Sequence, residues 1–198
     1  MSKAIKITKG LDLKLYGEPM PEVVETFVSE YALKPKDFIG LTPKLLIEEG
    51  ERVKAGTPLF YAKGKEKVLF TSPISGVVKQ VKRGEKRVIE EVIISADETI
   101  EYLDFGISSI SELNAEQIKE KLLISGAWTL LRQRPYSVVP NPDTTPKCII
   151  VSGFSSAPLA PDYSILLKGL GAELQVGVKK KKKMTGVTIH VNLPSQNA

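Results

Sequence analysis

The side chains best suited to chemistry near neutral pH are scarce, because the chain has one histidine, His190, and one cysteine, Cys148. A zinc or haem site needs several such ligands. The sequence also contains no P-loop and no G-x-S-x-G motif. His190 falls in a predicted strand with alternating neighbours, which is typical of a structural histidine. We therefore expect no catalytic residue, no metal site and no cofactor-binding residue in this chain.

Basic side chains are more numerous, and the net charge of +5 raises nucleic acid or an anionic membrane surface as partners. Only five of the 28 basic residues are arginines, whereas the reading of base edges relies heavily on arginine. Five consecutive lysines, 179–183, supply much of the excess and are typical of a solvated surface. We therefore expect no nucleic-acid partner.

Four of the arginines form two candidate contact sites. Arg83 and Arg87, with neighbouring lysines, surround Gly84 in a predicted turn. They could meet the carboxylates of a partner or a phosphate, but we favour a protective role, in which charge keeps a strand edge from pairing with other chains. Arg132 and Arg134 follow a predicted helix, where the helix dipole favours cations.

These side chains must be positioned by three kinds of structure. Residues 45–95 predict a compact β module, with turns at Gly50, Gly56 and Gly76 between short apolar runs. Residues 4–15 alternate in polarity and predict two short strands added to it. Residues 17–37 predict a loop-rich connector with an uncertain strand near 23–28.

A helix is predicted to begin at Asn114, because Gln117 follows it three positions later as in a capping box. Gly126 should end or bend this helix, and Trp128 belongs to a second apolar turn that Pro135 closes. The prolines that follow, at 140, 142 and 146, predict a stiff, extended linker.

From residue 147 the pattern becomes β-α-β. The apolar run 148–151 predicts a buried parallel strand, a helix capped near Asp162 should carry leucines at 166, 170 and 174, and 187–191 should return as a strand. The first turn lacks G-x-G-x-x-G, so we expect no nucleotide there. Lysines 179–183 interrupt the apolar stripe, which indicates that the helix ends near Val178 or that this stretch is altered. Two strands and a helix cannot bury both sheet faces, so this part looks truncated.

Several stretches together carry a family resemblance. They are Ile5 to Leu13, Glu49 to Leu59 with glycines at 50 and 56, Ser72 to Val78, Arg83 to Val88, and Ser125 to Pro135. The chain resembles the N-terminal part of the A-subunit family of Na+-translocating NADH:quinone reductases, and its β module resembles the biotinyl/lipoyl hammerhead domain. The implied fold class is α+β: a β sandwich or barrel-sandwich hybrid in 1–100, a helical segment and linker in 101–146, and a partial Rossmann-like domain in 147–198.

The resemblance implies a peripheral subunit on the cytoplasmic face of a bacterial inner membrane. The complex would couple NADH oxidation and quinone reduction to sodium export, with FAD, FMN, riboflavin and iron–sulfur centres in other subunits and no cofactor in this chain. Other subunits would be its partners, quinone a further candidate ligand, and membrane contact indirect. In this family the stretch around Arg132, Arg134 and Tyr136 enters the larger α/β domain, so it could line a cleft or a subunit contact.

Two alternatives remain open. Carrier domains of the biotinyl/lipoyl type present a modified lysine on a hairpin, and Lys65 lies near that place, eight residues before Pro73. Its neighbours Gly64 and Glu66 differ from those of the carriers, so we favour an unmodified, exposed lysine. The other alternative is the subunit of a related electron-transfer complex, whose cluster-binding cysteines would have to lie beyond residue 198. The single cysteine, the lack of a signal peptide and the absence of a long apolar run favour the cytoplasm.

Overall fold

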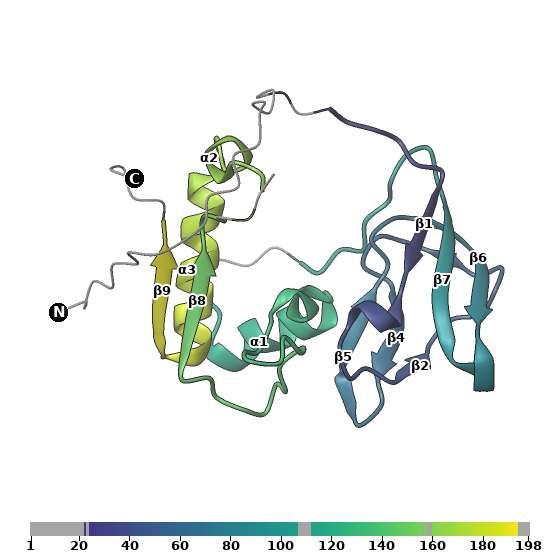
Figure 1. The fold of residues 1–198 in the computed structure, drawn as a ribbon, viewed down its shortest axis with the longest axis horizontal. Coiled ribbons are helices and arrows are strands. Elements are labelled where there is room, and N and C mark those ends of the chain that lie inside the picture. Colours follow the sequence, from purple (N-terminus) through teal and green to yellow (C-terminus); the bar gives the residue numbers. More distant parts are fainter. Residues whose placement is uncertain (1–21, 23, 107–111, 156, 158–159, 194–198) are drawn as a thin grey trace.

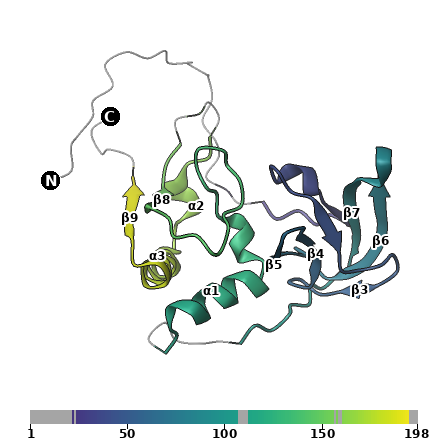
Figure 2. The same cartoon turned by 90° about the horizontal axis from the view of Figure 1, so that it is seen from below.

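The computed structural model describes residue 22 and residues 24–106, 112–155, 157 and 160–193. It places a β module beside a smaller α/β unit, with helix α1 between them (Figures 1 and 2). The two strands predicted within residues 4–15 lie outside the described residues. The order of elements, strands first and then helices with two further strands, confirms the α+β class.

Two antiparallel sheets form the β module, which confirms the sandwich predicted for 45–95. One sheet has the order β1-β7-β6-β3 and the other β2-β4-β5. Their bounds are β1 Glu30–Leu33, β2 Pro43–Leu45, β3 Arg52–Val53, β4 Pro58–Ala62, β5 Lys65–Thr71, β6 Gly76–Arg83 and β7 Ile89–Ala96. Side chains from both sheets meet in one core, in which Leu59, Val92 and Ile94 have no exposed surface.

Aromatic rings organise one end of this core. The ring of Phe60 stacks on that of Phe70 with centroids 4.9 Å apart, and Phe38 meets the Phe70 ring edge-on at 4.6 Å. Such ring pairs stabilise a fold by about 0.5–1.5 kcal/mol beyond their buried area. Phe38 follows the short 3-10 helix η1, Pro35–Asp37, so this ring ties the connector to the sheets.

The strand in the connector lies later than the sequence predicts. Val24 and Phe27 are exposed, and the strand is β1, Glu30–Leu33, which pairs with β7 through Tyr31 and Ile94. The apolar residues near 23–28 suggested the wrong place because the available edge of β7 decides which residues pair. The predicted final runs 88–94 are likewise a single strand, β7, whose hairpin with β6 contains the 3-10 helix η2, Glu85–Arg87.

The predicted connecting helix is confirmed as α1, Ala115–Ile124. Asn114 Oδ1 accepts the N–H of Gln117 at 2.9 Å, and Gln117 Oε1 accepts the N–H of Asn114 at 2.9 Å, so the capping box is complete. Gly126, with φ of 74°, then starts the 3-10 helix η3, Ala127–Leu130. This turn buries Trp128 against the β module.

The proline-rich stretch is not simply extended, as the sequence suggested. It turns at Asn141, whose side-chain oxygen accepts the N–H of Asp143 at 3.0 Å and whose carbonyl accepts the N–H of Thr144 at 3.2 Å. Asparagine side chains favour such turns by replacing backbone hydrogen bonds. The indole N–H of Trp128 donates to the carbonyl of Pro140 at 2.9 Å, which fastens the stretch to the connector.

The α/β unit confirms the predicted β-α-β order, because β8, Cys148–Ser152, and β9, Thr188–Asn192, are parallel. The expectation that β8 is buried is wrong: Ile150 is 59% exposed, since this sheet has only two strands within the described residues.

The single helix predicted between these strands is two helices. Asp162 caps α2, Tyr163–Leu166, as expected, but the chain turns at Gly169 with φ of 84° before α3, Gly171–Thr185. Helix α3 also continues through lysines 179–183, so the expected end near Val178 is wrong. The Nζ of Lys182 donates to the carbonyls of Gly186 and Val187 at the helix end, where the dipole favours cations.

Candidate functional site

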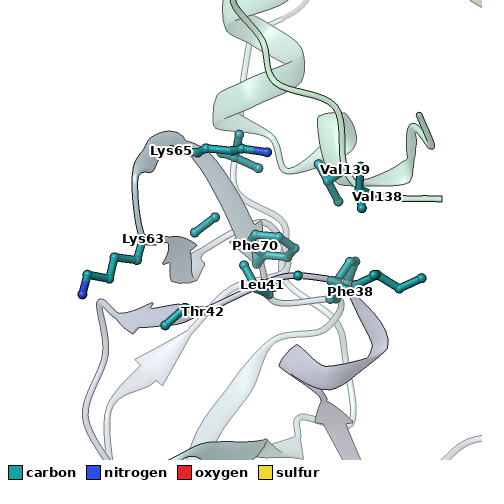
Figure 3. A pocket seen from close by; sticks show the side chains of 12 residues that line it. Phe38, Leu41, Thr42, Lys63, Lys65, Phe70, Val138 and Val139 are labelled. Carbon is teal, nitrogen blue, oxygen red and sulfur yellow. The ribbon is translucent and has the colours of Figure 1, made fainter. Parts of the chain in front are cut away.

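An open cavity of about 160 Å³ lies where three segments meet (Figure 3). Loop 38–42 forms one wall, the β4–β5 hairpin and β5 form the second, and a segment that follows η3 forms the third. The lining residues are Phe38, Ile39, Gly40, Leu41, Thr42, Ala62, Lys63, Lys65, Val68, Phe70, Val138 and Val139. Each wall contributes apolar side chains, so the cavity has an apolar floor.

The core supports this floor from below. Phe70 is 2% exposed and is fixed between Phe60 and Phe38, so the floor is rigid. The guanidinium of Arg132 lies over the ring of Phe38 at 5.4 Å from its centroid. Its Nη1 also donates to the carbonyls of Thr129 and Leu131 at the end of η3. Arg132 therefore completes the end of the short helix, as the sequence indicated, and borders the cavity as well.

Two lysines stand at the mouth of the cavity. Lys65 is the first residue of β5 and is half-buried, and its side chain extends toward the Val139 wall, whereas Lys63 is exposed and points away (Figure 3). Within the described ranges, neither lysine has an ion pair or a side-chain hydrogen bond.

Other lysines of the β module are paired with carboxylates. Lys34 lies 3.4 Å from Glu91, Lys54 lies 3.1 Å from Glu101, and Lys79 contacts Glu30. The positive charge at the mouth of the cavity is therefore left uncompensated by the described part of the chain.

The hairpin has the predicted place, but Lys65 does not occupy its turn. Ala62 and Lys65 are cross-strand partners, so the turn consists of Lys63 and Gly64, the latter with φ of 80°. The carboxylate of Glu66 accepts the N–H of Gly64 at 3.2 Å. Lys65 is thus more enclosed than the exposed turn lysine that we expected. Whether it is modified stays a matter for experiment.

Arg83 and Arg87 meet in the β6–β7 hairpin, away from the cavity. Arg83 Nη1 donates to the carbonyl of Arg87 at 3.4 Å, and both side chains are exposed. Lys86 and Arg87 have φ of 53° and 61°, a conformation that side chains other than glycine adopt at a cost. Nearby, Lys82 lies 3.7 Å from Glu91. A contact between these arginines and a partner stays a prediction.

Arg134 and Tyr136 lie on a small loop that Gln133 and Val138 close by an antiparallel bridge. Tyr136 is 77% exposed and Leu130 on η3 is 79% exposed, so this region presents apolar surface together with charge. Val138 of the same loop lines the cavity. The structure therefore brings Arg132 to the cavity and leaves Arg134 and Tyr136 on the adjacent surface.

The two side chains with the greatest chemical potential are far less organised. His190 is exposed on β9, not packed as a structural histidine would be, and Cys148 is half-buried on β8. Among the residues described, no group of three or more histidine, cysteine, aspartate or glutamate side chains could hold a metal ion. One carboxyl has a shifted pKa: hydrogen bonds from Ser164, from its side chain and its backbone N–H, lower the pKa of Asp162 below the usual 3.8.

Sequence reasoning missed most of the cavity. Phe38 and Leu41 belong to a loop without a strand or helix pattern, and Val138 and Val139 belong to a segment read as a linker. The available signal was the number of apolar residues in these loops, because solvent-exposed loops are usually polar.

Two family models match this chain in sequence order. Residues 5–97 match the NqrA N-terminal barrel-sandwich hybrid domain, and residues 113–198 match the NqrA second alpha/beta domain. The chain belongs to the NqrA family. The β module is therefore the barrel-sandwich hybrid domain of NqrA, which confirms the family and the fold class inferred from the sequence.

Individual relatives agree with the family models. The A subunit of the Na(+)-translocating NADH-quinone reductase of Serratia proteamaculans is 37% identical over 192 residues, which are 94% of this chain and 43% of the relative. The corresponding protein of Neisseria gonorrhoeae is 35% identical over 203 residues, 98% of this chain and 45% of the relative. That of Klebsiella pneumoniae is 36% identical over 194 residues, 96% of this chain and 43% of the relative. The chain thus spans less than half the length of these NqrA relatives.

No helix in the described part of the chain is long and apolar enough to cross a membrane. The NqrA relatives are named as subunits of a sodium-translocating reductase, and such a reductase needs several subunits. Other subunits are therefore the partners that membership of the NqrA family implies.

Proposed function

We propose that this chain is part of a peripheral subunit of a Na+-translocating NADH:quinone reductase, placed on the cytoplasmic face of the inner membrane. Its role is to dock against other subunits, without a cofactor of its own. The observation that carries the proposal is the match to both NqrA domains in order, with NqrA relatives that are 35–37% identical over almost the whole chain.

The surface of the chain supports a docking role. Exposed arginine and tyrosine side chains are over-represented at the centres of protein interfaces. Arg134 and Tyr136 have this character beside the cavity, and Arg83 and Arg87 have it in the β6–β7 hairpin. Flavins and iron–sulfur centres would belong to other subunits, membrane contact would be indirect, and quinone remains a candidate ligand of the assembled complex.

A co-purification experiment tests this proposal. The chain is produced with an affinity tag in cells that also express the remaining reductase subunits, and membranes are solubilised in mild detergent. We expect the tagged chain to retain the membrane subunits, and the same preparation to show NADH oxidation that sodium stimulates. A folded chain, judged by circular dichroism, that retains none of these subunits would contradict the proposal.

The carrier alternative has its own measurement. Intact mass of the chain purified from its own host should equal the mass of the unmodified sequence, because the neighbours of Lys65 differ from those of the carriers. A biotinyl or lipoyl mass increase on Lys65 would overturn the docking proposal. For the related electron-transfer complex, a full gene encoding cluster-binding cysteines after residue 198 would support that alternative.

A further inference from the structure

The cavity beside Lys65 has the size of a side-chain pocket. Its volume of about 160 Å³ is below the range of roughly 300–1,000 Å³ for sites that enclose drug-sized ligands or cofactors. Phe38, Leu41, Val68 and Phe70 make its lining largely apolar. A single large apolar side chain is therefore the unit that this cavity can hold.

The mouth of the cavity specifies charge. Its 12 lining residues include Lys63 and Lys65 and no acidic residue. Both lysines lack a carboxylate partner within the described ranges, whereas Lys34, Lys54 and Lys79 each have one. Uncompensated cations around an apolar pocket complement a ligand that carries an apolar group and a carboxylate.

The neighbouring surface favours an extended segment. Ile39 lines the cavity yet is 59% exposed, so apolar surface continues beyond its mouth. In an extended peptide, residues two positions apart point to the same side. An apolar side chain placed in the cavity would thus put a carboxylate two residues away on the side of the lysines.

We propose that this cavity binds an extended segment of a partner protein, whose large apolar side chain fills the pocket and whose carboxylate, two residues away, pairs with Lys65. The inference rests on the proposed docking function, because it identifies the partner as another subunit of the complex. It goes further by assigning the contact to this cavity and by stating the chemistry of the segment.

Peptide binding to the 198-residue chain tests the chemistry directly. The probe is a fluorescein-labelled, capped heptapeptide of glycine with a central phenylalanine and aspartates two positions to either side. Its two controls carry asparagine for aspartate, or alanine for phenylalanine. Fluorescence anisotropy should show binding of the probe below about 1 mM, weakened by salt, and at least about fivefold weaker binding of each control, as expected for loss of an ion pair or an anchor. Equal binding of the three peptides, or none at that concentration, would overturn the proposal.

Variants of the chain locate the site. Lys65→Gln and Ile39→Asp should each weaken probe binding about fivefold or more. The matched controls are Lys44→Gln, an exposed lysine outside the cavity, and Val88→Asp, whose exposure of 58% is close to the 59% of Ile39. The controls should bind the probe as the parent does, and thermal unfolding should show that all four variants fold. Loss of binding in the controls but not in the cavity variants would place the site elsewhere and refute the assignment.

Co-purification with the same variants separates the two proposals. If the parent chain retains the reductase subunits and the Lys65→Gln/Ile39→Asp double variant releases them, both proposals are supported. Unchanged retention by the folded double variant overturns the cavity assignment and leaves the docking function standing. Failure of the parent itself overturns the docking function. Binding of phosphatidylglycerol vesicles that Ile39→Asp abolishes, with no peptide binding, would assign the cavity to lipid and contradict the proposal.

Discussion

Gly126 lies directly against Thr71, and a β-carbon at Gly126 would come within 2.3 Å of the Thr71 hydroxyl oxygen. Thr71 Oγ1 also donates to the carbonyl of Ser125 at 3.4 Å. The end of strand β5 and the turn between α1 and η3 thus approach more closely than any side chain at 126 would permit. This contact fixes the connector, and through it the cavity wall formed by Val138 and Val139, on the β module.

Gly126→Ala should therefore destabilise the protein by about 2–4 kcal/mol, through the collision with Thr71 and the positive φ. The free energy of unfolding in urea measures this loss. Gly40→Ala is the matched control, because Gly40 has φ of 73° but open space around it, so only about 1 kcal/mol should be lost. Adding Thr71→Ala to the Gly126 variant should recover part of the loss. Equal effects of the two glycine substitutions would show that the close approach is unimportant.

Replacing Trp128 by phenylalanine should cost about 1–3 kcal/mol, since the carbonyl of Pro140 loses its indole donor at a buried position. Circular dichroism in urea measures the change. In the parent chain Trp128 is the only tryptophan, so its fluorescence reports this site alone. Pro140→Ala keeps the carbonyl and should leave the emission maximum unchanged. A red-shifted emission in the folded parent would contradict a buried indole.

Asn114→Ala should destabilise α1 by about 1 kcal/mol, because both halves of the capping box are lost. Gln117→Ala removes only the reciprocal bond and should cost less. Hydrogen exchange of the amides in the first turn of α1 would rise in the first variant more than in the second. If Gln117→Ala were the more damaging substitution, the side chain of Asn114 would not be the main cap.

The carboxyl pKa of Asp162, measured by NMR titration, should lie below 3.8. Ser164 lowers it by hydrogen bonds to the ionised form, from its side chain and its backbone N–H, so Ser164→Ala should raise the pKa and leave it still lowered by the backbone bond. Because the folded pKa is depressed, the contribution of this cap is present above the unfolded pKa and is lost as the pH falls through the folded value. An unshifted pKa in the parent would contradict the capping geometry.

The sequence alone was sufficient where local chemistry decides the structure. The capping pair Asn114 and Gln117 predicted the start of α1, Asp162 predicted a helix start, and alternating apolar runs predicted the β module. In each case the necessary interaction lies within a few residues, or the burial of one strand face demands it. The motifs around Gly50, Gly76 and Arg132 also indicated the NqrA family correctly.

Only the tertiary structure decided the rest. Strand β1 begins at Glu30 because β7 offers its edge there, and the helix divides at Gly169 although leucines at spacing four suggested continuity. The cavity depends on loop 38–42, β5 and Val139 meeting in space, and no local pattern encodes a meeting of segments so distant in sequence. Local propensity and spacing determine elements, whereas a binding cavity arises from the packing of those elements against one another.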